Sequence, residues 1–307
     1  MKQRNGTFFR AGLARIAAAT LLGGMLVLAV GCSAPSGDGA AQKADGAKKI
    51  RLAYIEWSDC TAATHVVQAV LENQGYQVQM LSVSGAAMYS AIAQGDADAT
   101  VCAWLPSTHE GYYARTRDKL VNLGANMEGT KIGLVVPVYV TIDSIDQLAA
   151  HAGKFKDRII GIDPGAGEMR IAQQAVEDYA LPLKLVDGSD ATMVAALKAA
   201  IDRHEWVVVT GWTPHWKWAR WPLKYLADPK GVFGGPESIN TLVRKGLAED
   251  DPIATHILGA FAWTAEDMQQ VMDANRAQGA NPAANARDWV AAHAGQVQSW
   301  LPPAAPQ

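Results

Sequence analysis

The sequence predicts an α/β protein of two domains between which the chain crosses twice, in the manner of a clamshell. Two observations lead to this expectation. Strand-like and helix-like stretches alternate in two successive blocks, residues 49–103 and 158–210, a pattern typical of βαβ units around a parallel sheet. A further strand-like run at residues 238–244 is followed by helical stretches, which returns the chain to the first domain. A ligand is then expected in the cleft between the two domains.

The first block contains three strand-like runs and two helical stretches. Strands are expected where apolar and β-branched residues alternate with polar ones, at residues 49–55, 76–81 and 97–103. Helices are expected at residues 61–74 and 86–94, and a glycine follows each of them, Gly75 and Gly95.

The second block is reached through a long β-rich run, residues 131–140. Pro137 favours an edge or crossover position for this run, which we interpret as the hinge between the domains. The expected strands beyond it are residues 158–162, 183–186 and 206–210. The expected helices are residues 144–150, 168–179, 190–202, 253–262, 265–275 and 283–300, with a loop at residues 224–231. The predicted domains are residues 49–138 with 234–307, and residues 139–233.

The first 31 residues are expected to be a signal peptide. Four basic residues precede an apolar run at residues 16–30, and Gly31-Cys32 follows it. The segment Ala29-Val30-Gly31-Cys32 resembles the lipobox of bacterial lipoproteins, with Leu28 one place earlier than usual, so Cys32 is the expected lipidation site. A plain signal peptide or an uncleaved membrane anchor is the alternative. Residues 32–48 are rich in small and polar side chains, which predicts a flexible tether.

The charge balance narrows the classes of partner. Without residues 1–31 the chain has 23 Lys and Arg, which is 27 less 4, against 30 Asp and Glu, a net charge of −7. This balance argues against a nucleic acid, which needs a basic patch. No second apolar run reaches the length of a transmembrane helix. We therefore expect an exported, monomeric protein in the periplasm or at the cell surface, anchored to the membrane by lipid, with no cofactor or metal.

Two cysteines remain, Cys60 and Cys102, at the ends of two neighbouring candidate strands. An oxidising compartment permits a disulfide between them, but spacing along the chain does not fix the distance between their Cα atoms. A disulfide and two free buried thiols are both compatible with the sequence. A free thiol beside a base such as His65 would indicate a cysteine-dependent hydrolase, a remote alternative because no recognised signature surrounds either cysteine.

Three strand-like runs each end in a tryptophan at the turn into a helix: Trp57, Trp104 and Trp212. Ligands of open α/β sheets bind at strand ends, so we expect the three indoles to meet in one pocket. Aromatic faces can hold a cation that has no N–H groups, each contributing about 0.5–1 kcal/mol when exposed and about 2 kcal/mol or more when desolvated. The remaining tryptophans are expected to serve packing: Trp206, Trp216, Trp218, Trp221, Trp263, Trp289 and Trp300.

An anionic ligand group would need hydrogen-bond donors. The turn at residues 163–168, Asp-Pro-Gly-Ala-Gly-Glu, opens a helix, so the N–H groups of Gly167 and Glu168 are expected to point outward with the helix dipole behind them. An ordinary strand-to-helix turn explains the same spacing. His109 is expected about one turn into a helix beside the tryptophans, where it could donate to a carboxylate. A structural histidine is the alternative.

Several segments, in the same order, resemble the OpuAC-like glycine betaine-binding proteins of ABC-type osmoprotectant importers. The segments are Ala53-Tyr54-x-x-Trp57, Ala103-Trp104-Leu105-Pro106-x-Thr108-His109, Gly133-Leu134-Val135-Val136-Pro137, Gly161-Ile162-Asp163-Pro164-Gly165-Ala166-Gly167 and Thr210-Gly211-Trp212-Thr213-Pro214-His215-Trp216. The resemblance extends over nearly all of the chain between residues 49 and 275. It implies a periplasmic-binding-protein fold, type II-like, with two hinge crossings, and ABC permease and ATPase subunits as partners.

The resemblance also implies roles for individual residues. It implies a cage of Trp57, Trp104 and Trp212 around a trimethylammonium group. The ligand's carboxylate would be held by the backbone amides of Gly167 and Glu168 and by His109.

Asp59 departs from the pattern. An acid two residues past a cage tryptophan also resembles choline-binding relatives, in which it faces the cation or a hydroxyl group. Glycine betaine or a related quaternary ammonium compound is the expected ligand, and choline or carnitine is the alternative on the same fold.

Overall fold

A computed structural model of the chain describes residues 48–303, and the strands among them form one continuous mixed sheet. The strand order is β2-β1-β3-β9-β4-β7-β5-β6, with β8 beside β4. The predicted α/β class is confirmed, and so are the two crossings, which run through β4 and between β8 and β9. The expected signal peptide, the lipidation of Cys32 and the tether up to residue 47 lie outside the described residues.

We call the part of the molecule around the first strands the first lobe. Its parallel strands are β1 (Lys49–Tyr54), β2 (Gln77–Ser82) and β3 (Ala99–Leu105), and β9 (Glu237–Arg244) pairs with β3 in the antiparallel sense. Its first helices are α1 (Ser58–Asn73), α2 (Gly85–Gln94) and α3 (Glu110–Thr116). Every residue of β3 is buried, because β1 and β9 flank it and helices cover the sheet. The return of β9 makes the sheet mixed rather than purely parallel.

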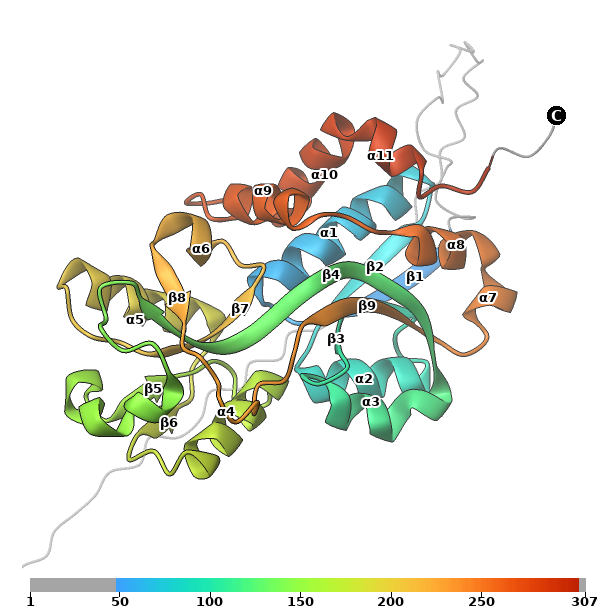
Figure 1. Cartoon of the computed structure of the whole chain (residues 1–307). Helices are drawn as coiled ribbons and strands as arrows, with labels where there is room; N and C mark the ends of the chain where they lie inside the picture. The colour runs from blue at the N-terminus through green and yellow to red at the C-terminus, as the bar shows by residue number, and fades with distance from the viewer. Residues whose placement is uncertain (1–47, 304–307) are drawn as a thin grey trace, which may run out of the picture. The chain divides into compact units, whose positions relative to one another are not determined.

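Strand β4 (Leu120–Pro137) carries the chain from one lobe to the other, as Figure 1 shows. Its first part pairs with β9 and its last residues pair with β7 and β8, all in the antiparallel sense. The sequence indicated only the second half of this strand. The first half contains Gly124 and Gly129, both with positive φ, and its pairing with β9 shifts register three times, so no regular alternation marks it.

The second lobe holds the rest of the sheet. Its elements are β5 (Arg158–Ile160), β6 (Lys184–Val186), β7 (Val209–Thr213), β8 (Leu223–Tyr225), α4 (Gly167–Asp178), α5 (Asp190–Asp202) and α6 (Lys217–Arg220). Strand β7 begins three residues later than expected, and β8 takes up the first residues of the expected loop at 224–231. The helix expected at residues 144–150 is replaced by two 3₁₀ segments, Ile145–Gln147 and Ala149–Phe155.

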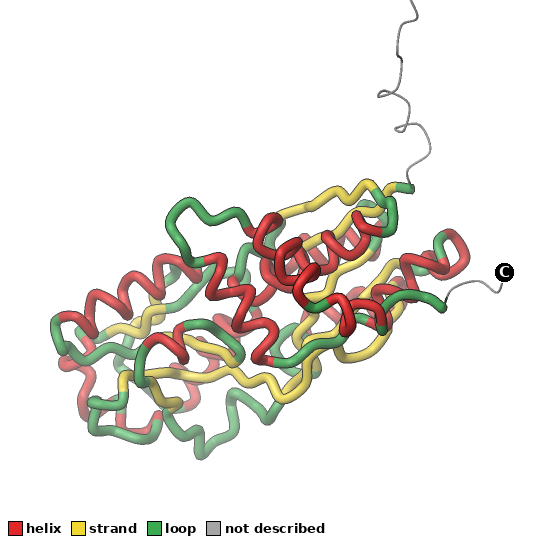
Figure 2. The backbone as a smooth tube through the Cα atoms, turned by 90° about the horizontal axis from the view of Figure 1, so that it is seen from above, coloured by secondary structure: helices red, strands yellow, loops and turns green. Residues whose placement is uncertain are grey.

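The last helices return to the first lobe, where α1 packs against α9 and α10 (Figures 1 and 2). These helices are α7 (Leu247–Asp250), α8 (Pro252–Ala260), α9 (Ala265–Asn275), α10 (Pro282–Ala292) and α11 (Ala294–Gln298). The single helix expected at residues 283–300 is interrupted at His293, which leaves the helical conformation. Among the helices of residues 48–303, none combines the length and the apolar character that crossing a bilayer requires.

A disulfide joins Cys60 to Cys102, with 2.02 Å between the sulfurs and 5.4 Å between the Cα atoms. Cys60 lies in the first turn of α1, which starts three residues earlier than expected, and Cys102 lies within β3. The bond therefore ties the start of α1 to the central strand of the first lobe, next to Trp57 and Trp104. It leaves neither cysteine as a free thiol.

We expect replacement of both cysteines by alanine to lower the free energy of unfolding by about 4 kcal/mol. The bridge closes a loop of 42 residues, and the conformational entropy that this loop removes from the unfolded chain sets the magnitude. Urea denaturation followed by tryptophan fluorescence measures it. The unaltered protein treated with reductant is the control and should match the variant. Equal midpoints for the oxidised protein and the variant would contradict the expectation.

Candidate ligand-binding site

Three tryptophans from distant parts of the chain line one cavity. They are Trp57, Trp104 and Trp212, with side chains 6%, 3% and 3% exposed. The ring centroids of Trp57 and Trp212 are 6.4 Å apart. The structure thus brings together the three indoles that the sequence singled out. The other lining residues are Thr108, Ile132, Ile162 and Glu168.

The backbone of each tryptophan is held by regular structure. Trp57 is the residue before α1, whereas Trp104 and Trp212 lie inside β3 and β7 rather than at turns. Trp104 is paired with Ile239 of β9, and Trp212 is paired with Ile132 of β4. Strand pairing therefore fixes the backbone positions of two of the three tryptophans.

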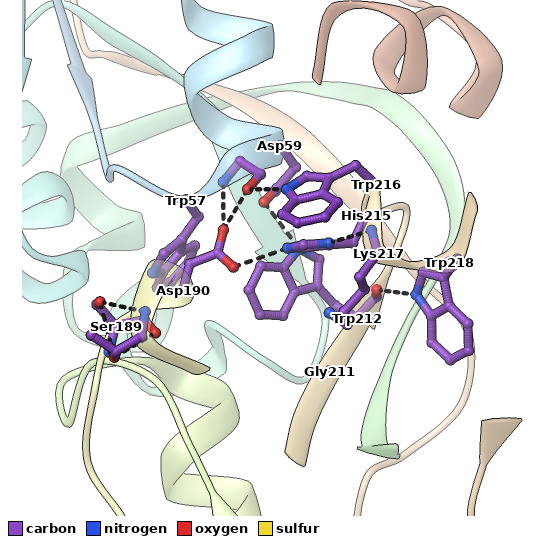
Figure 3. A network of polar contacts seen from close by, with 12 residues as sticks. Trp57, Asp59, Ser189, Asp190, Gly211, Trp212, His215, Trp216, Lys217 and Trp218 are labelled. Carbon is purple, nitrogen blue, oxygen red and sulfur yellow. Dashed lines mark hydrogen bonds and ion pairs between the residues drawn. The ribbon is translucent and has the colours of Figure 1, made fainter. Parts of the chain in front are cut away.

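The indole N–H groups of all three tryptophans are bound by carboxylates. Asp59 accepts from Trp212 at 3.0 Å with one oxygen (Figure 3). It accepts from Trp104 at 3.3 Å with the other. Trp57 donates to Asp163 of the second lobe at 3.0 Å. Asp59 is not among the residues that line the cavity, so it stands behind the rings instead of facing the space between them. Burial and the charge of Asp190 raise the pKa of Asp59 to about 6, against the two indole hydrogen bonds.

His109 is fully buried and neutral. It is the residue before α3, not a residue one turn inside a helix as the sequence suggested. Its Nδ1 accepts the backbone N–H of Trp104 at 3.1 Å, so the ring hydrogen is assigned to Nε2. Burial lowers its pKa to about 3. Nε2 has no hydrogen-bond partner among the described residues, and the ring lies 5.9 Å from that of Trp57 without lining the cavity.

Gly167 and Glu168 are the first two residues of α4, so their N–H groups have no acceptor within the helix. Gly167 packs directly on the first lobe: a Cβ atom placed there would lie 1.9 Å from the carbonyl oxygen of Thr108. The side chain of Glu168 lines the cavity and accepts the backbone N–H of Gly211 at 2.7 Å. The side-chain position of Glu168 was not foreseen, because the turn motif concerns only its backbone.

Lys217, at the start of α6, is a buried cation that the sequence did not single out. Its side chain is 0% exposed, and Nζ lies 4.2 Å from the ring centroid of Trp212. Nζ has no hydrogen-bond partner within residues 48–303. Burial lowers the pKa of Lys217 and raises that of Glu168, while the opposite charges of the two groups offset both effects. Nothing in the local pattern Trp-Lys-Trp distinguishes this lysine from an exposed one.

Asp190, at the start of α5, connects the second lobe to the start of α1. Its carboxylate accepts from the backbone N–H of Ser58 at 3.0 Å and from its hydroxyl at 2.5 Å, and it pairs with Nε2 of His215 at 2.9 Å (Figure 3). Burial alone would raise the pKa of Asp190, but His215, Lys217 and Ser58 hold it at about 2. Burial lowers the pKa of His215 to about 4, so its ring is neutral. Asp190 therefore supplies the cap that α1 lacks locally.

Between residues 48 and 303, no group of three or more His, Cys, Asp and Glu side chains is arranged to hold an ion. The cavity combines the rings of three tryptophans with the side chain of Glu168, a residue at the start of α4.

Comparisons with known proteins identify relatives of this chain. The profile of the family OpuAC, the substrate-binding domain of ABC-type glycine betaine transport systems, matches residues 48–292. The glycine betaine/carnitine transport binding protein GbuC of Listeria monocytogenes is 44% identical over 146 residues, which cover 46% of this chain and 48% of GbuC. The chain thus matches about half the length of that relative.

Two solved structures extend the similarity over most of the chain. Lactococcal OpuAC, in its closed form with glycine betaine, is 38% identical with a TM-score of 0.79, covering 83% of this chain and 100% of that one. A choline-binding protein of an ABC transporter, in complex with choline, is 25% identical with a TM-score of 0.77, covering 82% and 91%. With its two lobes, its mixed sheet and a family match over most of its length, the chain belongs to the OpuAC family of substrate-binding domains of ABC-type glycine betaine transport systems.

Proposed function

We propose that this protein captures glycine betaine, or a closely related quaternary ammonium compound, between its lobes and delivers it to an ABC importer. The observation that carries the proposal is the cavity lined by Trp57, Trp104 and Trp212. A trimethylammonium group has no N–H to donate, and desolvated aromatic faces are the protein groups suited to it. Membership of the family and the similarity to OpuAC with glycine betaine support the same ligand class.

The ligand's carboxylate is assigned to donors that have no acceptor among residues 48–303. These are the N–H groups of Gly167 and Glu168 at the start of α4 and Nε2 of His109. A helix start attracts an anion through its free N–H groups and its dipole. A buried imidazole N–H without an acceptor is costly unless a ligand supplies one.

Capture requires the lobes to meet, because the cavity has walls from both. Trp57, Trp104 and Thr108 belong to the first lobe, while Ile162 and Trp212 belong to the second. The proposed lobes are residues 49–138 with 234–307 and residues 139–233. Strand β4 changes partner from β9 to β7 between Thr130 and Lys131, which supports a crossing within β4, ahead of the bound at residue 138.

Choline is the second candidate ligand, and carnitine remains within the same class. The carboxylate of Asp59 lies behind the cavity wall and attracts a cation. The similarity to a choline-binding protein supports this alternative. The free donors near α4 favour a ligand that carries a carboxylate.

We further propose that the protein is an exported, monomeric lipoprotein anchored through Cys32, with the permease and ATPase of an importer as its partners. The basic and apolar residues before Cys32 and the family's place in ABC transport support this proposal. A catalytic role is not proposed, because the hydrolase alternative needed a free thiol at Cys60 or Cys102 and the structure bonds the two sulfurs to each other.

Replacement of Trp212 by alanine is expected to weaken glycine betaine binding by about thirtyfold or more. The change removes one desolvated aromatic face, worth about 2 kcal/mol. Isothermal titration calorimetry measures the dissociation constant. Trp206→Ala is the matched control, since Trp206 packs against Phe155 in the second lobe and not at the cavity. Equal losses in the two variants would contradict the cage.

Replacement of His109 by leucine is expected to weaken glycine betaine binding by roughly tenfold and to leave tetramethylammonium binding nearly unchanged. The lost interaction is one hydrogen bond to a charged oxygen, which tetramethylammonium does not possess. Calorimetry with both ligands tests this. An equal loss for both would show that His109 acts only by holding the backbone of Trp104.

Replacement of Gly167 by alanine is expected to hold the lobes apart. The new methyl group would meet the carbonyl of Thr108, and overpacking of about 1–3 kcal/mol would weaken glycine betaine binding by roughly tenfold to a hundredfold. Small-angle X-ray scattering should show no compaction when ligand is added. Gly165→Ala is the control, because a Cβ atom there has no neighbour within 4 Å. Full compaction of the Gly167 variant would refute this role.

A further inference from the structure

We propose that Lys217 is a specificity-determining residue whose resident positive charge makes the cavity prefer a zwitterion over a simple monocation. The inference rests on the proposed function, since it concerns how the same cavity chooses among quaternary ammonium compounds. It assigns a role to a buried charged group that belongs neither to the tryptophan cage nor to the donors proposed for the ligand's carboxylate.

The position of Lys217 sets it against a cavity wall. Its Nζ lies 4.2 Å from the ring centroid of Trp212, and Trp212 lines the cavity while Lys217 does not. Figure 3 shows Lys217 beside Trp212, with Asp59 at the indole N–H. The lysine stem is packed below β7, since a Cβ atom on Gly211 would come 3.2 Å from its Cε. The ring of Trp212 therefore lies between the ammonium group of Lys217 and any cation bound in the cavity.

The charges buried around Trp212 explain why a lysine stands there. Three carboxylates are nine-tenths or more buried in this region, those of Asp59, Glu168 and Asp190. All three favour the charged form of Lys217 and so raise its pKa, whereas His109 and His215 are neutral. Because burial raises the pKa of Glu168, the negative charges that Lys217 offsets are those of Asp59 and Asp190.

Ligands of different net charge respond differently to this arrangement. A monocation such as choline, placed against the cavity face of Trp212, is repelled by Lys217 across the ring. A zwitterion such as glycine betaine is repelled at its ammonium end and attracted at its carboxylate end, so the two contributions partly cancel. The positive charge of Lys217 therefore weakens the binding of choline more than it weakens the binding of glycine betaine.

The test is Lys217→Met, which keeps the length of the side chain and removes its charge. We expect choline to bind about tenfold more tightly to the variant, from the loss of one repulsion across the ring in a partly desolvated site. Glycine betaine should change by less than about threefold, so the ratio of the two dissociation constants shifts toward choline. Calorimetry with both ligands on the folded, full-length mature protein measures the ratio.

Two controls separate charge from shape. The uncharged choline analogue 3,3-dimethylbutan-1-ol, measured by competition, should bind the variant and the unaltered protein equally. Lys198→Met makes the same substitution at an exposed lysine of α5 that pairs with Asp202, and it should leave the ratio unchanged. If Lys217→Met does not fold, as circular dichroism would report, Lys217→Gln replaces it with the same expectation.

The outcomes are distinct. An unchanged ratio, or equal loss of choline, glycine betaine and the uncharged analogue, overturns the role of Lys217, because the lysine would then only support the ring of Trp212. Failure of the unaltered protein to bind either quaternary ammonium compound overturns the proposed function itself, and this inference with it.

Discussion

The site depends on one carboxylate that holds two rings. Asp59 accepts the indole N–H groups of Trp104 and Trp212, one on each oxygen, at the start of α1. Buried indole N–H groups need an acceptor, and an unpaired one would cost free energy at the centre of the cavity. A single residue thereby satisfies two donors that come from different lobes. It also ties the edges of the two indoles to one point, which sequence spacing does not reveal.

The hydrogen bonds that complete the cavity also join the lobes. Trp57 of the first lobe donates to Asp163 of the second, and Asp190 of the second lobe accepts from Ser58 of the first. Each of these contacts involves the first residues of α1 or the residue before it. The start of α1 is therefore capped by the opposite lobe, and closure of the lobes satisfies donors that would otherwise face solvent.

Much of the fold was predictable from local patterns, because alternation marks β1 and β2 and a following glycine marks α1 and α2, each to within a few residues. The tryptophans of the cavity were also predictable, from their position near strand ends and from ordered motifs. The first half of β4 was not, because its bulges and glycines break the alternation. Its strand conformation comes from pairing with β9, more than a hundred residues away.

The site residues that sequence reasoning missed share a physical cause. Thr108, Ile132 and Ile162 face the cavity only because the two lobes meet there. Asp59 was expected to face the ligand, and its role as an indole acceptor becomes visible only when Trp104 of β3 and Trp212 of β7 both meet the start of α1. In each case the decisive neighbour is distant in the chain.

The electrostatics of the cavity follow from the same long-range packing. The buried carboxylates would by themselves favour any cation, while the free N–H groups at the start of α4 favour an anion. A ligand that carries both charges at a short separation meets both demands at once. The neutral state of His109 is part of this balance, since a charged imidazole beside Trp57 would repel the ammonium group, whereas a neutral N–H can still donate to a carboxylate. Burial of the histidine thus allows one cavity to accept opposite charges a few ångströms apart.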